Sequence, residues 1–86
     1  MYRIYTADIN RDEIESILQS FVDGYTLIPA SGAWKGIPEK SLVIELCVSK
    51  HYAPIVKHIA QRICQLNKQE AVMVQWFKTS EILVTK

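Results

Sequence analysis

The sequence is poor in cysteine, and its histidines lack partners. The two cysteines, Cys47 and Cys64, have neither CxxC nor histidine spacing, which argues against a disulfide framework and a zinc site. Each lies in an apolar pattern, so we expect reduced core thiols. His51 and His58 have no Cys, Asp or Glu at metal-ligand spacing. No activated nucleophile or carboxylate pair is evident, so we expect no metal, no cofactor and no catalytic residue.

Net charge and long apolar runs are also missing. Ten basic and nine acidic residues are spread along the chain and give a formal charge of +1, which offers no field to attract nucleic acid or an anionic membrane. No segment approaches the ~20 apolar residues that span a bilayer, and a strand-like pattern follows Met1 directly, without a signal region. We therefore expect a soluble, cytoplasmic protein without nucleic-acid or membrane partners.

What the chain does contain is apolar surface. Its 86 residues fit one domain, 1–86, and 49% of them are apolar, which is typical of a globular chain. A domain of this size buries only roughly 60–65% of the surface of its unfolded chain. Because this leaves a small stability margin, we expect help from a partner subunit.

Hydrophobic periodicity predicts two helices, each between strand patterns. The pattern of residues 2–7 predicts a strand. Asn10 is predicted to be the N-cap of a helix, with a capping box to Glu13. The helix carries an apolar stripe at Ile14, Ile17, Leu18, Phe21 and Val22 and stops at Gly24. Pro54 begins a second helix that ends near Asn67, with apolar positions Tyr52, Ile55, Ile59, Ile63 and Leu66.

The residue patterns of the remaining segments predict strands and one long loop. We expect strands at 25–30, 41–48 and 71–77, a short last strand at 81–85, and a loop at 31–40. Pro29 cannot donate to a ladder, so the strand that contains it belongs at an edge or ends there.

The order of these elements predicts the fold class. It is α+β, β-α-β-β-α-β with an extra short C-terminal strand, which corresponds to a ferredoxin-like antiparallel sheet with two helices on one face. Residues 71–77 carry bulky apolar groups on both strand faces, including Trp76 and Phe77. We expect the second face to pack on another subunit, and the charge balance disfavours the alternative of a stacking platform for single-stranded nucleic acid.

All three glycines fall between residues 24 and 36, which makes this region the candidate ligand site. Gly32 and Gly36 bracket Trp34 and Lys35, so the backbone could form an anion-binding nest with Lys35 as the charge and Trp34 as a stacking surface. Ser31 opens the same loop. The alternative is a hairpin loop that needs glycine for its turn, with Trp34 packed on the sheet; no phosphate-binding fingerprint is present.

Four further residues complete the candidate site. Tyr25 and Thr26 would form its wall, or they are ordinary strand residues with Tyr25 in the core. Gln69 and Glu70 precede the fourth strand, where a carboxylate could accept from a ribose or pair with Lys35; the alternative is a solvated turn.

The layout resembles the PII-like superfamily, which includes PII and the CutA-like proteins. The shared features are Gly24-Tyr25-Thr26-Leu27 after a helix, the glycine-bearing loop 31–36, the strand at 42–48, a second helix and the strands at 71–77 and 81–85. The resemblance implies a trimer that binds nucleotides or other small effectors in intersubunit clefts. Two features depart from PII: the loop is shorter, and residues 65–70 lack the Gly-rich basic turn that holds nucleotide phosphates.

These observations predict a non-enzymatic homo-oligomer, with a trimer favoured, that binds a small polar or phosphorylated, nucleotide-like molecule. Its use would be sensing, or the sequestration of a nucleotide messenger, as a viral anti-defence protein would do. The competing hypothesis is a structural or protein-interaction module that uses the open sheet face and has no ligand.

Overall fold

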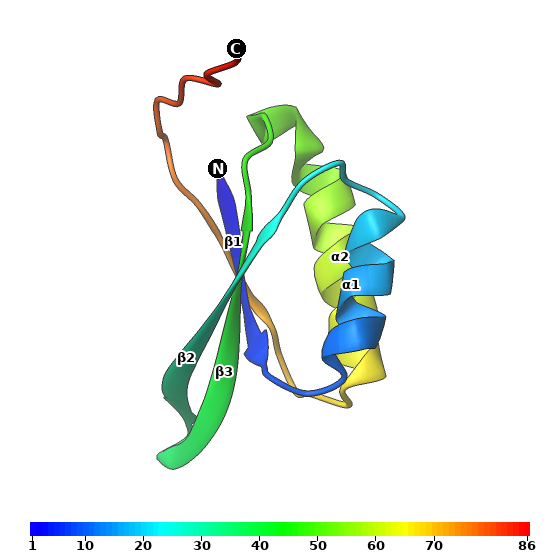
Figure 1. Ribbon diagram of the computed structural model, residues 1–86. Coiled ribbons are helices and arrows are strands. Elements are labelled where there is room, and N and C mark those ends of the chain that lie inside the picture. Colours follow the sequence, from blue (N-terminus) through cyan, green and yellow to red (C-terminus); the bar gives the residue numbers. More distant parts are fainter.

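The computed structural model describes residues 1–86 as one sheet with both helices on the same side (Figure 1). The elements are β1 (Tyr2–Ala7), α1 (Arg11–Gln19), β2 (Thr26–Trp34), β3 (Ile37–Leu46), a 3-10 turn (Lys50–Tyr52), α2 (Ala53–Leu66) and β4 (Met73–Trp76). The protein is therefore an α+β domain with a four-stranded antiparallel sheet, a layout compatible with the ferredoxin-like arrangement.

The sheet has the strand order β2-β3-β1-β4. β1 lies at its centre, with Ile4 opposite both Ile44 of β3 and Val74 of β4. β2 is an edge strand, as Pro29 predicted, although Pro29 itself stays in register opposite Leu42. The outer edges of β2 and β4 have no further strand beside them.

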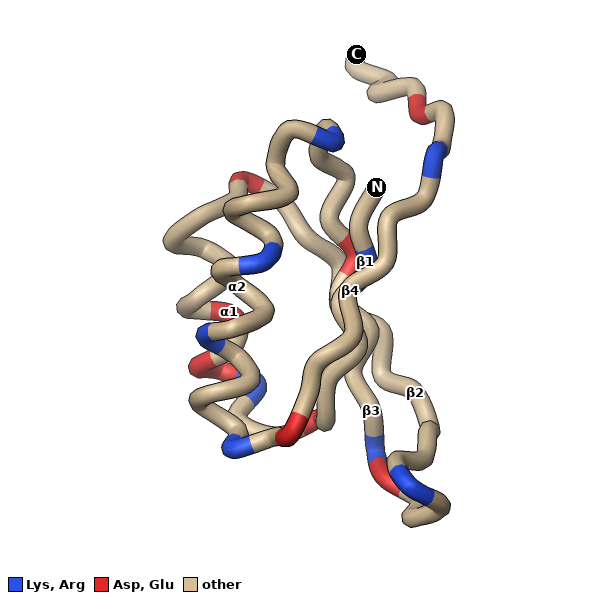
Figure 2. The backbone as a smooth tube through the Cα atoms, turned by 180° about the vertical axis from the view of Figure 1, so that it is seen from behind, with Lys and Arg blue, Asp and Glu red and all other residues tan.

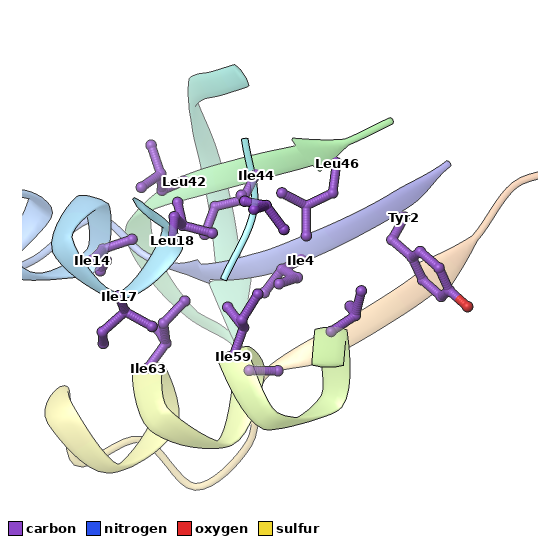
Figure 3. Packing of buried hydrophobic residues seen from close by; sticks show 13 residues of the cluster. Tyr2, Ile4, Ile14, Ile17, Leu18, Leu42, Ile44, Leu46, Ile59 and Ile63 are labelled. Carbon is purple, nitrogen blue, oxygen red and sulfur yellow. The ribbon is translucent and has the colours of Figure 1, made fainter. Parts of the chain in front are cut away.

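Alternation along β1 and β3 directs one set of side chains to the helices. Ile4, Leu42, Ile44 and Leu46 are fully buried (Figure 3). From the helices they meet a second set of buried side chains, which consists of Ile14, Ile17, Leu18, Val22, Val56, Ile59, Ala60 and Ile63. The apolar stripe predicted for the first helix packs on the core, but the helix ends at Gln19 and not at Gly24, so Phe21 and Val22 follow it. In α2 the buried face is shifted, because Val56 is buried while Ile55 and Tyr52 are more than one-third exposed.

The predicted capping box at Asn10 is not formed. Asn10 adopts left-handed backbone angles and makes no side-chain cap. Its Nδ2 instead donates to Asn67 Oδ1 at 3.0 Å, and Asn67 Nδ2 donates to the carbonyl of Ile9 at 3.3 Å. The start of α1 is thus tied to the end of α2, a tertiary contact that competed successfully with local capping.

The loop expected at 31–40 is a pair of strands. β2 continues to Trp34 and β3 begins at Ile37, so only Lys35 and Gly36 form the turn. The hairpin projects beyond the helices at one end of the molecule and the C-terminal segment at the other (Figure 1), and the long dimension is 44 Å. The prediction failed because the segment has few apolar residues to reveal its pairing, although each of its two strands has the other as a ladder partner.

Two other predictions are wrong. Residues 81–85 form no strand; they belong to a C-terminal segment that leaves the sheet, with Ile82, Leu83 and Val84 at least 84% exposed (Figure 1). Cys47 is exposed, because it follows the last residue of β3 on the face away from the helices, and Cys64 is only partly buried.

Charged side chains of both signs are interspersed over the helices and the hairpin (Figure 2). Neither helix combines the length and the apolar character that crossing a membrane requires.

Candidate functional site

A hollow lies where the hairpin meets the segment that enters β4. It has a volume of about 550 Å³. Its floor comes from residues of β1 and β3 that point away from the helices, and its sides from the far half of the hairpin and from residues 69–73. Of the predicted site residues, the structure brings together Ser31, Gly32, Trp34, Gln69 and Glu70 around this hollow.

An ion pair closes one side of the hollow. Lys35 Nζ lies 2.8 Å from Glu70 Oε2, and both side chains are more than 60% exposed. Of the alternatives that the sequence left open for Glu70, the structure shows the pairing with Lys35, in a segment that is nevertheless exposed to solvent. The ion pair connects the tip of the hairpin to the segment before β4, two parts of the chain that share no strand ladder.

The turn at the hairpin tip depends on left-handed backbone angles. Lys35 has φ of 51° and Gly36 has φ of 79°, the signs that a tight two-residue hairpin turn needs at both positions. Gly32 lies in β2, paired with Glu39, so it does not contribute to an anion-binding nest. The nest predicted from Gly32 to Gly36 is not formed, because this backbone is engaged in a ladder.

The small size of Gly32 helps to form the hollow. A Cβ added to Gly32 would lie 2.6 Å from Ser41 Oγ, closer than such atoms approach without one of them moving. The lining also contains four alanines: Ala7, Ala30, Ala33 and Ala71. This part of the open sheet face is thus hollowed by missing side-chain volume.

Larger side chains border the hollow. Trp34 is 48% exposed and Met73 54% exposed, while Tyr5, opposite Met73 in the ladder, is half-buried. Trp34 has no aromatic partner, unlike Trp76, whose ring centroid lies 4.7 Å from that of Tyr2. An aromatic surface therefore stays open at the hollow, and Trp34 is not packed away as a core residue.

The polar lining carries carboxylates but no basic side chain. Glu39 and Glu70 are its two charged residues, and Ser31, Ser41 and Gln69 add neutral polar groups. Gln69 is held in place: its Oε1 accepts from Thr6 Oγ1, and its backbone N–H donates to the carbonyl of Cys64. The side-chain amide N of Gln69 makes no hydrogen bond within the protein.

Tyr25 and Thr26 do not line the hollow at the hairpin. They line a second depression of about 520 Å³ near the start of β2, together with Glu45, Cys47 and Tyr52. Tyr25 Oη donates to Glu15 Oε1 at 2.8 Å and accepts from Gln19 Nε2 at 3.0 Å. The bond to Glu15 raises the pKa of Tyr25 above its ordinary value. The prediction that Tyr25 and Thr26 form a wall of the same site is wrong, because strand length separates the two ends of β2.

The remaining titratable candidates form no reactive group. His58 is exposed and packs edge-on against Phe21 at 5.2 Å, and His51 lies in the short turn before α2, as expected. No three His, Cys, Asp or Glu side chains lie close enough together to hold a metal ion.

Sequence reasoning missed several lining residues. Tyr5, Ser41, Val43 and Met73 reach the hollow because their strands are neighbours in the order β2-β3-β1-β4. Glu39 was hidden in the supposed loop. Strand alternation gives the face of each residue, but not which strands lie next to one another.

Comparison with known proteins adds no assignment: no protein-family model matches the chain, and no curated protein matches it.

Proposed function

We propose that the protein binds a small polar organic molecule in the hollow at the hairpin and does so without transforming it. The observation that carries this proposal is the convergence of an open tryptophan face, a cluster of polar side chains and a space of about 550 Å³ at one end of the sheet. That volume lies in the range of small-molecule sites.

We further propose a relationship to the PII-like proteins and a homo-oligomer, with a trimer favoured. The β-α-β-β-α-β element order supports the ferredoxin-like arrangement on which that resemblance depends. Exposed apolar side chains support a subunit contact: Ile28 and Met73 lie on the open sheet face, Ile37 at the hairpin tip, and Ile82 to Val84 in the C-terminal segment. A neighbouring subunit on this face would cover the open side of the hollow.

The role in the cell would be sensing or sequestration of the ligand. The hairpin is tied back to the body through Lys35 and Glu70 and has a two-residue turn. Because a sensor needs a mobile arm to report its state, this short, tethered hairpin favours sequestration.

Native mass spectrometry of protein purified from cells, followed by thermal shift against a metabolite panel, tests the proposal. A retained small molecule, or a compound that raises the melting temperature, is expected, since a ligand that binds only the native state stabilises it. The Trp34→Ala variant should lose this shift. Ile55→Ala is the control, because Ile55 lies on α2, is 38% exposed and does not line the hollow.

A protein-interaction module is the second candidate. It is favoured by the apolar residues Ile82, Leu83 and Val84, which no part of the chain covers. In that case no metabolite would shift the melting temperature. Deletion of residues 81–86 would abolish self-association or partner binding and would leave the fold intact.

A further inference from the structure

We infer that the hollow selects a small organic cation, a protonated amine attached to a flat or compact apolar body, and rejects phosphorylated molecules. This inference rests on the proposed function, since it names the class of ligand for the same site. It departs from the nucleotide-like ligand that the sequence suggested.

The first argument is the sign of the charge. The lining contains Glu39 and Glu70 but no Lys, Arg or His. Glu39 makes no ion pair, whereas Glu70 is paired with Lys35 at the edge of the hollow. A phosphate in this space would be repelled by the unpaired carboxylate of Glu39, and a cation would be attracted to it.

The nearby cations are already engaged. Lys35 is paired with Glu70. Arg3, on the same sheet face, donates from Nε to Glu45 Oε2 at 2.8 Å and lies 5.1 Å above the ring of Phe77. Lys40 makes no ion pair, but it alternates with Glu39 and Ser41 along β3 and therefore lies on the opposite face of the hairpin. A phosphorylated ligand would have to compete with a carboxylate for Lys35 or Arg3, whereas an amine could approach Glu39 without disturbing either pair.

The second argument is the aromatic surface. The register places Trp34 and Glu39 on the same face of the hairpin, since Gly32 lies opposite Glu39 and Trp34 follows two residues later. Tryptophan offers the strongest aromatic face to a cation. A carboxylate beside an open indole ring suits an ammonium group, and the apolar floor formed by Tyr5, Val43 and Met73 suits the body to which that group is attached.

The backbone supports the same conclusion. A phosphate site without basic side chains would need free backbone N–H groups, as at a helix N-terminus or a nest. The β2 residues of the lining are extended strand paired with β3, so they form no nest, and the outward N–H groups of this edge strand lie in the plane of the sheet and do not point into the hollow. No helix begins at the hollow.

Three probes that share one ring separate the effect of charge from that of shape: phenethylamine, 2-phenylethanol and phenylacetate. Binding to the full chain is measured by isothermal titration at low salt, with adenosine 5′-monophosphate and inorganic phosphate as further probes. Phenethylamine is expected to bind most tightly and phenylacetate most weakly. Added salt should weaken the binding of phenethylamine and leave that of 2-phenylethanol unchanged.

Two variants link the affinity to the hollow. Glu39→Gln should weaken phenethylamine binding about fivefold and leave 2-phenylethanol unaffected. Trp34→Leu should weaken phenethylamine more than 2-phenylethanol, because it removes the aromatic face and keeps apolar volume. Glu13→Gln, the same chemical change at an exposed residue of α1, is the control and should alter neither.

The inference is overturned if phenethylamine fails to bind, if an anionic probe binds as tightly as it does, or if Glu39→Gln has no effect. Tight binding of phenylacetate or adenosine 5′-monophosphate that Trp34→Leu abolishes would leave the proposed function standing with a different class of ligand. If neither these probes nor any compound of the metabolite panel binds, both proposals fail.

Discussion

Lys35 Nζ and Glu70 Oε2 lie 2.8 Å apart and connect the turn of the β2–β3 hairpin to the segment that enters β4. The two residues belong to opposite edges of the sheet, because β2 is one edge strand and β4 the other. The pair therefore closes one side of the hollow whose lining includes Glu70, and it restrains the tip of a hairpin that projects beyond the helices (Figure 1).

The Lys35–Glu70 pair should contribute little to global stability. Both partners are more than 60% exposed, so a double-mutant cycle with Lys35→Met and Glu70→Gln is expected to give a coupling of about 1 kcal/mol or less in chemical denaturation. Hydrogen exchange should nevertheless speed up at the hairpin tip in both single variants. Unchanged exchange there would show that the ion pair does not restrain the hairpin.

Ile44→Ala should be strongly destabilising. Ile44 is fully buried between the sheet and the helices, and truncating such a side chain leaves a cavity that costs about 2–5 kcal/mol. Ile37→Ala on the same strand is the control; with Ile37 70% exposed, we expect a change within about 0.5 kcal/mol. Equal effects in urea denaturation would contradict the position of the core.

Gly36→Ala should destabilise the hairpin by about 1 kcal/mol, since the φ of 79° at Gly36 is unfavourable for any residue with a Cβ. Gly24→Ala is the matched control. Gly24 has no positive φ and no atom within 4 Å of an added Cβ, so this change should be neutral or slightly stabilising. Thermal denaturation of the two variants side by side makes the comparison; a larger loss at Gly24 would argue against the turn.

The hydrogen bond from Tyr25 to Glu15 should make stability depend on alkaline pH. The bond raises the native pKa of Tyr25 above its ordinary value of 10.0, so the folded state holds the proton more tightly than the unfolded state does. The associated stabilisation is fully present below about pH 10 and is lost as pH rises through the raised native pKa.

The predicted pH dependence is checked by measuring the denaturant midpoints of the wild type and Tyr25→Phe from pH 8 upward. The advantage of the wild type should shrink as the pH rises past the native pKa. Tyr52→Phe is the control, because Tyr52 forms no hydrogen bond to a carboxylate in the structure and its replacement should not change the pH profile. An advantage of Tyr25 that stays constant over this range would contradict the raised pKa.

Local sequence patterns were sufficient to predict the core and the positions of most helices and strands. β1 has the predicted bounds, and the stripe from Ile14 to Val22 packs on the sheet, because apolar periodicity records which side of an element is buried. The pairing of Lys35 with Glu70 was one of the alternatives that the sequence left open, and the structure decided between them.

Other features were decided in three dimensions. Residues 31–40 have weak strand propensity, yet they extend the hairpin because each strand satisfies the backbone groups of the other. Asn10 looked like a helix cap and instead binds Asn67 at the end of the other helix.

The candidate site also has one part that the sequence predicted and another that only the tertiary structure showed. The sequence by itself indicated that Lys35, Gln69 and Glu70 would lie outside the core, since they fall in its least apolar segments, and it left open whether Trp34 packs on the sheet. Only the tertiary structure brought Tyr5, Glu39 and Met73 to the same hollow and moved Tyr25 away from it, because the order of strands in a sheet is set by packing between distant parts of the chain.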